Sequence, residues 1–174
     1  MHLTIKKTNI MGLFSNGLAE VLAGAIAADG GMGTTLTPVG KILEDSFGLV
    51  TEEGNTVTFK SEESDDPEFE RKTGKALGFE FTIMDPTVDT LIRFMGGTKG
   101  AGDEYEAPDK TPIIELSIQI KPEMGLGFDF VRASIDSSFT DKMGKNNLLG
   151  IKVKGKILKP KKSGASKFKM PVYA

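Results

Sequence analysis

Apolar residues stand at every second position in the middle of the chain: Leu77-Gly78-Phe79-Glu80-Phe81-Thr82-Ile83-Met84. Successive side chains of a β-strand point to opposite faces of a sheet, so a period of two directs one set into a core and the other toward water. The inward set here is large and includes two phenylalanines. The stretch therefore predicts a half-buried strand.

The period changes directly after this strand. Asp85 can cap a helix, and Pro86 suits the first helical position. The apolar residues then recur at i, i+3, i+4 and i+7 until Gly96-Gly97 ends the pattern: Val88, Leu91, Ile92 and Met95. We predict one short helix over about residues 86–95. So short a helix is not stable alone, which means that its apolar stripe must pack on a sheet.

Further strand patterns lie on both sides of these elements. They cover residues 35–39, 56–60, 113–121, 127–137 and 149–158, with a less regular pattern at 167–173. Residues 18–28 could form a helix or a strand by composition, and Gly24 with the turn that follows favours a strand. The alternation of the strand patterns differs from the continuous apolar runs of buried parallel strands. We therefore predict a mainly β fold, an antiparallel β-sandwich or barrel of about 6–8 strands with one short flanking α-helix.

The chain length of 174 residues indicates one domain, because domains average about 150 residues. We expect a flexible N-terminal arm at residues 1–17 and a single β-sandwich or barrel domain at residues 18–174. Two long loops are predicted within the domain, at about residues 62–74 and 97–112. Long loops without secondary structure are uncommon in compact domains and tend to bind something.

The composition argues against catalysis. There is no cysteine and one histidine, His2, which removes thiolate chemistry and nearly every imidazole mechanism. A net charge of −2 gives no general attraction to nucleic acid or to an anionic membrane. The longest apolar stretch, residues 21–28, is far shorter than the roughly 20 residues that cross a bilayer. We expect no enzyme activity, no cofactor, no metal and no membrane partner.

Three features offer weaker chemistry. Residues 30–33 are glycine-rich but lack the following Lys-Ser or Lys-Thr of a phosphate loop, so we predict a turn. An acidic run at residues 62–68 could in principle hold calcium, but its spacing is not that of a calcium loop. Sequence spacing alone does not exclude a pair of carboxylates brought together by two strands, as in glycoside hydrolases.

Charge is segregated along the chain. Residues 44–70 contain ten acidic residues and one lysine, whereas residues 142–169 contain ten lysines and no acidic residue. The candidate acidic site is Glu62, Glu63, Asp65, Asp66 and Glu68, and the candidate complementary basic face is Lys152, Lys154 and Lys156. The two regions either balance each other within one subunit or lie on opposite faces. Opposite faces would allow copies to associate head to tail.

Several segments together resemble a known family. They are Ala27-Ala28-Asp29-Gly30-Gly31-Met32-Gly33, Asp65-Asp66-Pro67, Phe79-Glu80-Phe81-Thr82-Ile83-Met84-Asp85-Pro86, Asp89-Thr90-Leu91 and Phe94-Met95-Gly96-Gly97. In this order they resemble the major tail tube proteins of long-tailed bacteriophages and prophages. The resemblance is clearest over residues 27–97 and weaker through residue 159.

The resemblance implies an antiparallel sandwich or barrel with a flanking helix, shared with type VI secretion tube proteins. It further implies a virion tail protein, made in the bacterial host cytoplasm, whose copies close hexameric rings that stack into a tube. The tube encloses the tape-measure protein, contacts other tail proteins and lets DNA pass. Long loops or terminal arms bridge successive rings in that family.

Two questions stay open at the level of sequence. The acidic residues 62–68 would either line the lumen, where carboxylates repel DNA phosphates, or meet Lys152, Lys154 and Lys156 of the next ring. The chain could alternatively be a secreted or cell-surface module, adhesin-like or ligand-binding, built on the same β-sandwich.

Overall fold

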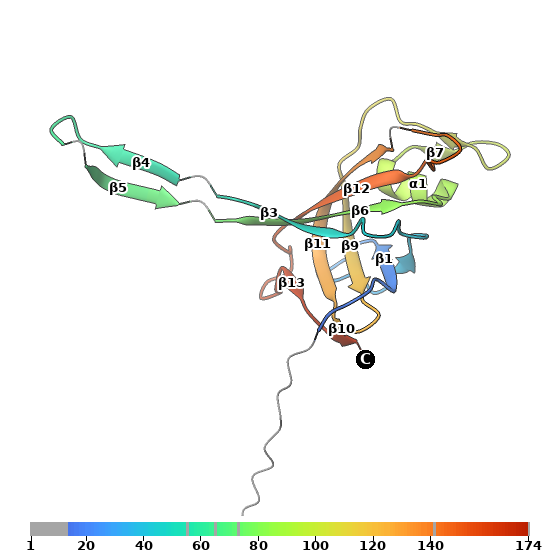
Figure 1. Cartoon of the computed structure of the whole chain (residues 1–174), viewed down its shortest axis with the longest axis horizontal. Coiled ribbons are helices and arrows are strands. Elements are labelled where there is room, and N and C mark those ends of the chain that lie inside the picture. Colours follow the sequence, from blue (N-terminus) through green and yellow to red (C-terminus); the bar gives the residue numbers. More distant parts are fainter. Residues whose placement is uncertain (1–13, 55, 65, 73, 141, 174) are drawn as a thin grey trace, which may run out of the picture.

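The computed structural model describes residues 14–54, 56–64, 66–72, 74–140 and 142–173, and it is mainly β. An eight-stranded antiparallel sheet forms the body of the molecule (Figure 1). Its strands run across the sheet in the order β2 (Thr37–Pro38), β1 (Glu20–Gly24), β9 (Ile114–Lys121), β11 (Phe128–Phe139), β12 (Ile151–Ile157), β6 (Ala76–Ile83) and β3 (Gly48–Glu52), and β13 (Phe168–Lys169) also pairs with β11. The predicted fold class, antiparallel β with one helix, is confirmed.

A single apolar core lies on one face of this sheet. The strand predicted first, β6, supplies Phe79, Phe81 and Ile83, each at most 1% exposed. The Phe79 ring reaches across β12 and stacks on Phe130 of β11 with 5.0 Å between ring centroids. Gly155 of β12 lies beneath that ring, and a Cβ at this position would overlap it. The glycine is therefore required so that two aromatic rings two strands apart can touch.

The helix α1 (Val88–Met95) covers the core, but it begins later than predicted. Thr87 is the N-cap residue, and its hydroxyl accepts a hydrogen bond from the Thr90 backbone N–H at 3.2 Å. Asp85, the predicted cap, instead accepts a hydrogen bond from the Lys41 backbone N–H at 2.6 Å. The innermost side chain is that of Phe94, which the predicted stripe omitted; its ring meets Phe81 edge to face.

The ends of the described chain are held by short backbone pairings. Residues 1–13 of the predicted N-terminal arm lie outside the described residues. In the described remainder of that N-terminal segment, Asn16 forms an isolated antiparallel bridge with Met124. The C-terminal β14 (Val172–Tyr173) pairs with β10 (Gly125–Leu126). The predicted turn at residues 30–33 is present, with Gly30 at a φ of 78°.

The two predicted loops contain strands. In residues 97–112, β7 (Thr98–Lys99) pairs with β8 (Tyr105–Glu106) beside the helix. In residues 62–74, β5 (Pro67–Lys72) pairs with β4 (Thr56–Lys60), so the prediction of a loop without secondary structure over these residues was wrong. The strand β5 packs on no core, so it needs no apolar face. Its charged sequence therefore lacks the apolar alternation by which a buried strand is recognised.

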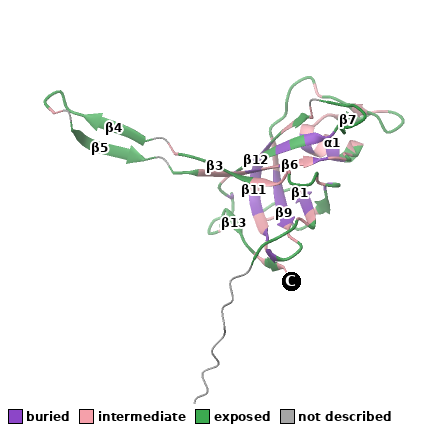
Figure 2. Ribbon diagram, in the orientation of Figure 1, coloured by how far each residue is buried: buried purple, intermediate pink, exposed green. Residues whose placement is uncertain are grey.

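The β4–β5 hairpin, here called the arm, projects from the body (Figure 1). No strand was predicted at β3, which pairs with β6 from Gly48↔Glu80 to Glu52↔Ala76. Beyond that point the same two chain segments continue as β4 and β5, with Thr56 opposite Lys72. The arm is thus the distal half of one long hairpin whose proximal half belongs to the core sheet. Figure 2 shows both strands of the arm as exposed.

Candidate assembly surfaces

The arm carries an aromatic pair in water. Phe59 and Phe69 lie opposite each other on β4 and β5, with 6.0 Å between their ring centroids. Their exposed fractions are 52% and 61%, and Val57 on the same face of the ribbon is 48% exposed. An isolated two-stranded hairpin is marginally stable in water. A ribbon that exposes aromatic residues is therefore suited to pack against another surface.

The predicted acidic site forms the tip of the arm. Glu62, Glu63, Asp66 and Glu68 are exposed around the turn between β4 and β5, and Asp65 lies outside the described residues. Ser64 accepts a hydrogen bond from the Asp66 backbone N–H at 3.2 Å, which holds the turn. The structure therefore brings the predicted acidic residues together, at the end of an extended ribbon.

The predicted basic residues also share one face, on β12. Lys152, Lys154 and Lys156 are exposed and alternate with buried residues of the core. Acidic residues of the same sheet lie beside them: Lys152 is 3.5 Å from Glu80 of the neighbouring β6, and Lys156 is 3.1 Å from Glu52 of β3, one strand further along. Lys154 is paired in register with Glu80 on one side and Asp136 of β11 on the other. The lysine row is thus neutralised in part by its own sheet.

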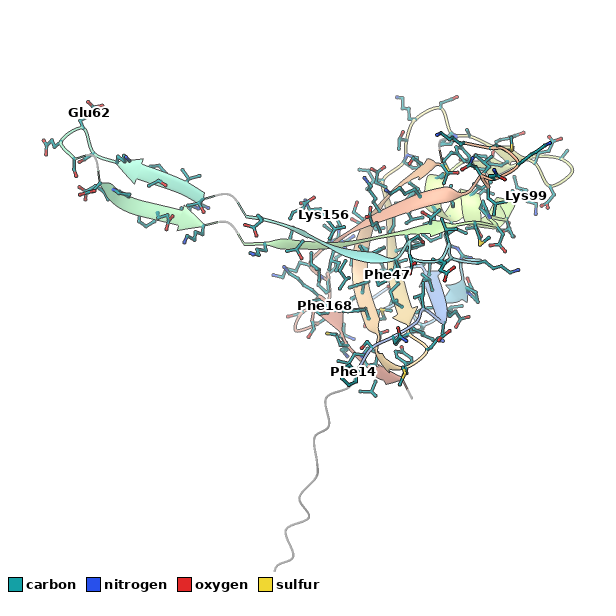
Figure 3. The ribbon with its side chains drawn as sticks, in the orientation of Figure 1. Phe14, Phe47, Glu62, Lys99, Lys156 and Phe168 are labelled. Carbon is teal, nitrogen blue, oxygen red and sulfur yellow. The ribbon has the colours of Figure 1, made fainter. Side chains whose placement is uncertain are left out.

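The acidic tip and the lysine row do not meet within the subunit. Figure 3 places Glu62 at the far end of the arm and Lys156 near the root, on the body. The tip therefore keeps its negative charge for another surface. The partners of the lysine row on β3, β6 and β11 could not be read from the sequence, since they follow from strand order and register.

Ion pairs on the body act on its folding. Arg132 of β11 donates two hydrogen bonds to Glu115 of β9, at 2.9 and 2.6 Å. The Arg132 guanidinium holds the pKa of the Glu115 carboxyl below its ordinary value. At the turn after β1, the Lys162 ammonium and the Gly31 N–H lower the pKa of Asp29 in the same way. These contacts link β9 to β11 and fix the turn.

A second exposed apolar surface lies at the end of β6 opposite the arm. The β11–β12 loop, residues 140–150, leaves Met143, Leu148 and Leu149 in water, with Leu148 62% exposed. A groove of about 390 Å³ between this loop and Leu43 is called here the far-end groove. This apolar surface was not predicted from the sequence. The signal that could have indicated it is the presence of apolar residues in a loop that also carries lysines.

The described residues contain no group of three or more histidine, cysteine, aspartate or glutamate side chains placed to hold a metal ion. No helix among them is long and apolar enough to span a membrane. A groove of about 900 Å³ lies between residues 15–20 and residues 40–47. Its ionisable side chains are Glu20, Lys41, Glu44, Asp45 and Asp85. This set has no imidazole, and it consists of four carboxylates and one amine.

Comparison with protein-family models and with curated proteins finds no match to this chain.

Proposed function

We propose that this chain is a structural subunit that assembles with its own copies into stacked hexameric rings, the tail tube of a long-tailed bacteriophage or prophage. The observation that carries the proposal is the arm, a ribbon with an exposed Phe59–Phe69 pair and an acidic tip that extends away from the body. Such a ribbon gains stability when a neighbouring molecule covers it.

The body supports self-assembly by its sheet edges. The strand order begins at β2 and ends at β3, so each of these strands has one side without a neighbour in the sheet. A strand edge of this kind presents backbone N–H and C=O groups that can pair with another copy. Closed rings would cover both edges, because each subunit can place its β3 edge beside the β2 edge of the next.

The number of six subunits and the passage of DNA rest on the sequence resemblance. The tape-measure protein and other tail proteins are proposed partners on the same ground. The structure adds a physical argument about DNA: the lysine row is interleaved with Glu52, Glu80 and Asp136. A face of mixed charge holds phosphates weakly, because the neighbouring carboxylates repel them. Such a face would let DNA slide if it lined the lumen.

Electron microscopy of the purified full chain in negative stain tests this proposal directly. We expect rings of six and rods made of stacked rings. Raising the ionic strength from about 0.05 M to 0.5 M should shorten the rods, because screening weakens attraction between exposed charges. A monomer that persists at all protein concentrations and salt concentrations would contradict the proposal. It would favour the alternative, a solitary binding module on the cell surface.

A further inference from the structure

We propose that the arm of one subunit docks in the far-end groove of a second copy. This inference rests on the proposed function, and it names the surface that receives the arm. The far-end groove contains three apolar side chains, those of Leu43, Met84 and Leu148, with Lys142 as the charged residue among its described lining. The arm offers aromatic residues and a negative tip, so the two surfaces are chemically complementary.

The two surfaces lie at opposite ends of one strand. The arm leaves the body where Glu52 pairs with Ala76, at the start of β6. The far-end groove lies where Ile151 pairs with Ile83, at the end of β6. Eight residues at about 3.3 Å each separate these ends. Because the arm points away from the body, it does not reach the groove of its own subunit (Figure 1). The contact must therefore be head to tail, between copies.

The apolar parts match in kind and in size. Phe59 and Phe69 form one contiguous pair on the arm, and Leu43 and Leu148 are 45% and 62% exposed at the groove. A cavity of about 150 Å³ holds one benzene ring. The far-end groove, at about 390 Å³, has room for both phenyl rings. Docking would remove apolar surface of both copies from water, which is the main driving force for association.

The acidic tip of the arm is better matched in charge to the β11–β12 loop than to the lysine row. The β11–β12 loop carries Lys142 and Lys145, both exposed. No salt bridge of the described residues includes either of them, whereas Lys152 and Lys156 each lie within 4 Å of a carboxylate of their own sheet. The acidic tip therefore gains more from the loop lysines than from the row, since the row already has neighbours of opposite sign.

The absence of native cysteine allows a direct test by disulfide cross-linking. Phe69→Cys on the arm and Leu148→Cys at the groove are prepared as separate full-length variants, mixed, and oxidised. We expect a disulfide-linked dimer in the mixture and none in either variant alone. Phe69→Cys mixed with Lys154→Cys is the matched control, because Lys154 is exposed on the lysine row. This control should give no dimer.

The outcomes distinguish the inference from the proposed function. Arg71→Cys replaces Phe69→Cys in a second mixture, since Val57 and Arg71 are paired on the same ribbon face and the aromatic pair stays intact. If rods form but neither mixture with Leu148→Cys cross-links, or if the Lys154→Cys control cross-links instead, the arm docks elsewhere and this inference is wrong. If the wild-type chain forms no assemblies, the proposed function fails and the inference fails with it.

Discussion

The two halves of the β3–β6 hairpin show what packing adds to strand pairing. In the proximal half, β6 pairs with β12 and contributes Phe79, which is 1% exposed, to the core. The distal half pairs in the same antiparallel way, yet Phe69 is 61% exposed there. Both halves are antiparallel pairs, and the distal one has a register shift between Phe59 and Lys60. The difference lies in apolar burial, so the proximal half stabilises the monomer and the distal half is left for association.

Removal of the arm should have the largest effect. Replacing residues 54–74 by Asn-Gly joins Glu53 to Lys75, whose side chains already pair at 3.0 Å, through a favoured two-residue turn. We expect loss of the rods in electron microscopy, because the head-to-tail contact is removed while the β2 and β3 edges remain. The free energy of unfolding of the monomer, measured in urea, should change by less than about 1 kcal/mol.

A destabilised body in this shortened chain would contradict the comparison, because it would mean that the arm contributes to the core. The matched control keeps the arm length and replaces its exposed threonines, Thr56→Ser and Thr58→Ser. These substitutions leave the aromatic face unchanged and should preserve assembly.

Truncation of one phenylalanine in each half should separate folding from association. Phe79→Ala removes a buried ring stacked on Phe130 and should lower the free energy of unfolding by about 3–5 kcal/mol. Phe69→Ala should change it by less than about 0.5 kcal/mol, because the ring is exposed in the monomer. The measurement is urea unfolding at a protein concentration where sedimentation shows monomer. Equal losses for both variants would overturn the distinction between the two halves.

Charge reversal at the arm tip should have a smaller effect, confined to assembly. The double variant Glu62→Lys, Glu63→Lys should weaken association at low salt, as measured by sedimentation, without changing the unfolding free energy by more than about 0.5 kcal/mol. Adding Lys142→Glu and Lys145→Glu should restore association if the tip meets the β11–β12 loop. Failure of this rescue, with rods still salt-sensitive, would assign the tip to a different basic surface.

Lowering the pH should reduce the free energy of unfolding of the body by a small amount. The pKa of Glu115 is lowered in the folded chain by its hydrogen bonds to Arg132, from an ordinary value of 4.5. The stabilisation is therefore complete above about pH 4.5 and is lost as the pH falls through the lowered folded value. Glu115→Gln should flatten the dependence of the unfolding midpoint on pH below about pH 4.5. An unchanged pH profile would show that the Glu115–Arg132 pair does not contribute to acid sensitivity.

The strands of the core could be predicted from the sequence because each one displays its burial. Ile151, Val153 and Ile157 alternate with three lysines on β12, and the same period marks β6. The strand β3 escaped prediction because it is an edge strand with Leu49 and Val50 both partly in water. The N-cap shifted from Asp85 to Thr87 because the Asp85 carboxylate is engaged by the Lys41 backbone, a contact across distant parts of the chain.

Only part of each candidate surface could be predicted from the sequence. Residues 62–68 were recognised as acidic and exposed, but their position on a paired ribbon was not, because β5 lacks the apolar alternation that burial imposes. The lysine face on β12 followed from a period of two. Its acidic neighbours depend on register between strands far apart in the sequence, such as Lys156 and Glu52. A sequence does not display such register.

The continuity of the arm with β3 and β6 has a mechanical consequence. Tension applied to the tip travels along these two strands, parallel to their length, into the middle of the sheet, where β6 is paired with β12 over Gly78–Ile83. A load in this direction shears the whole row of inter-strand bonds together instead of opening them one after another. In a stacked assembly, a pull on one subunit would thus be borne by the most deeply packed strands of the next, and not by a flexible tether.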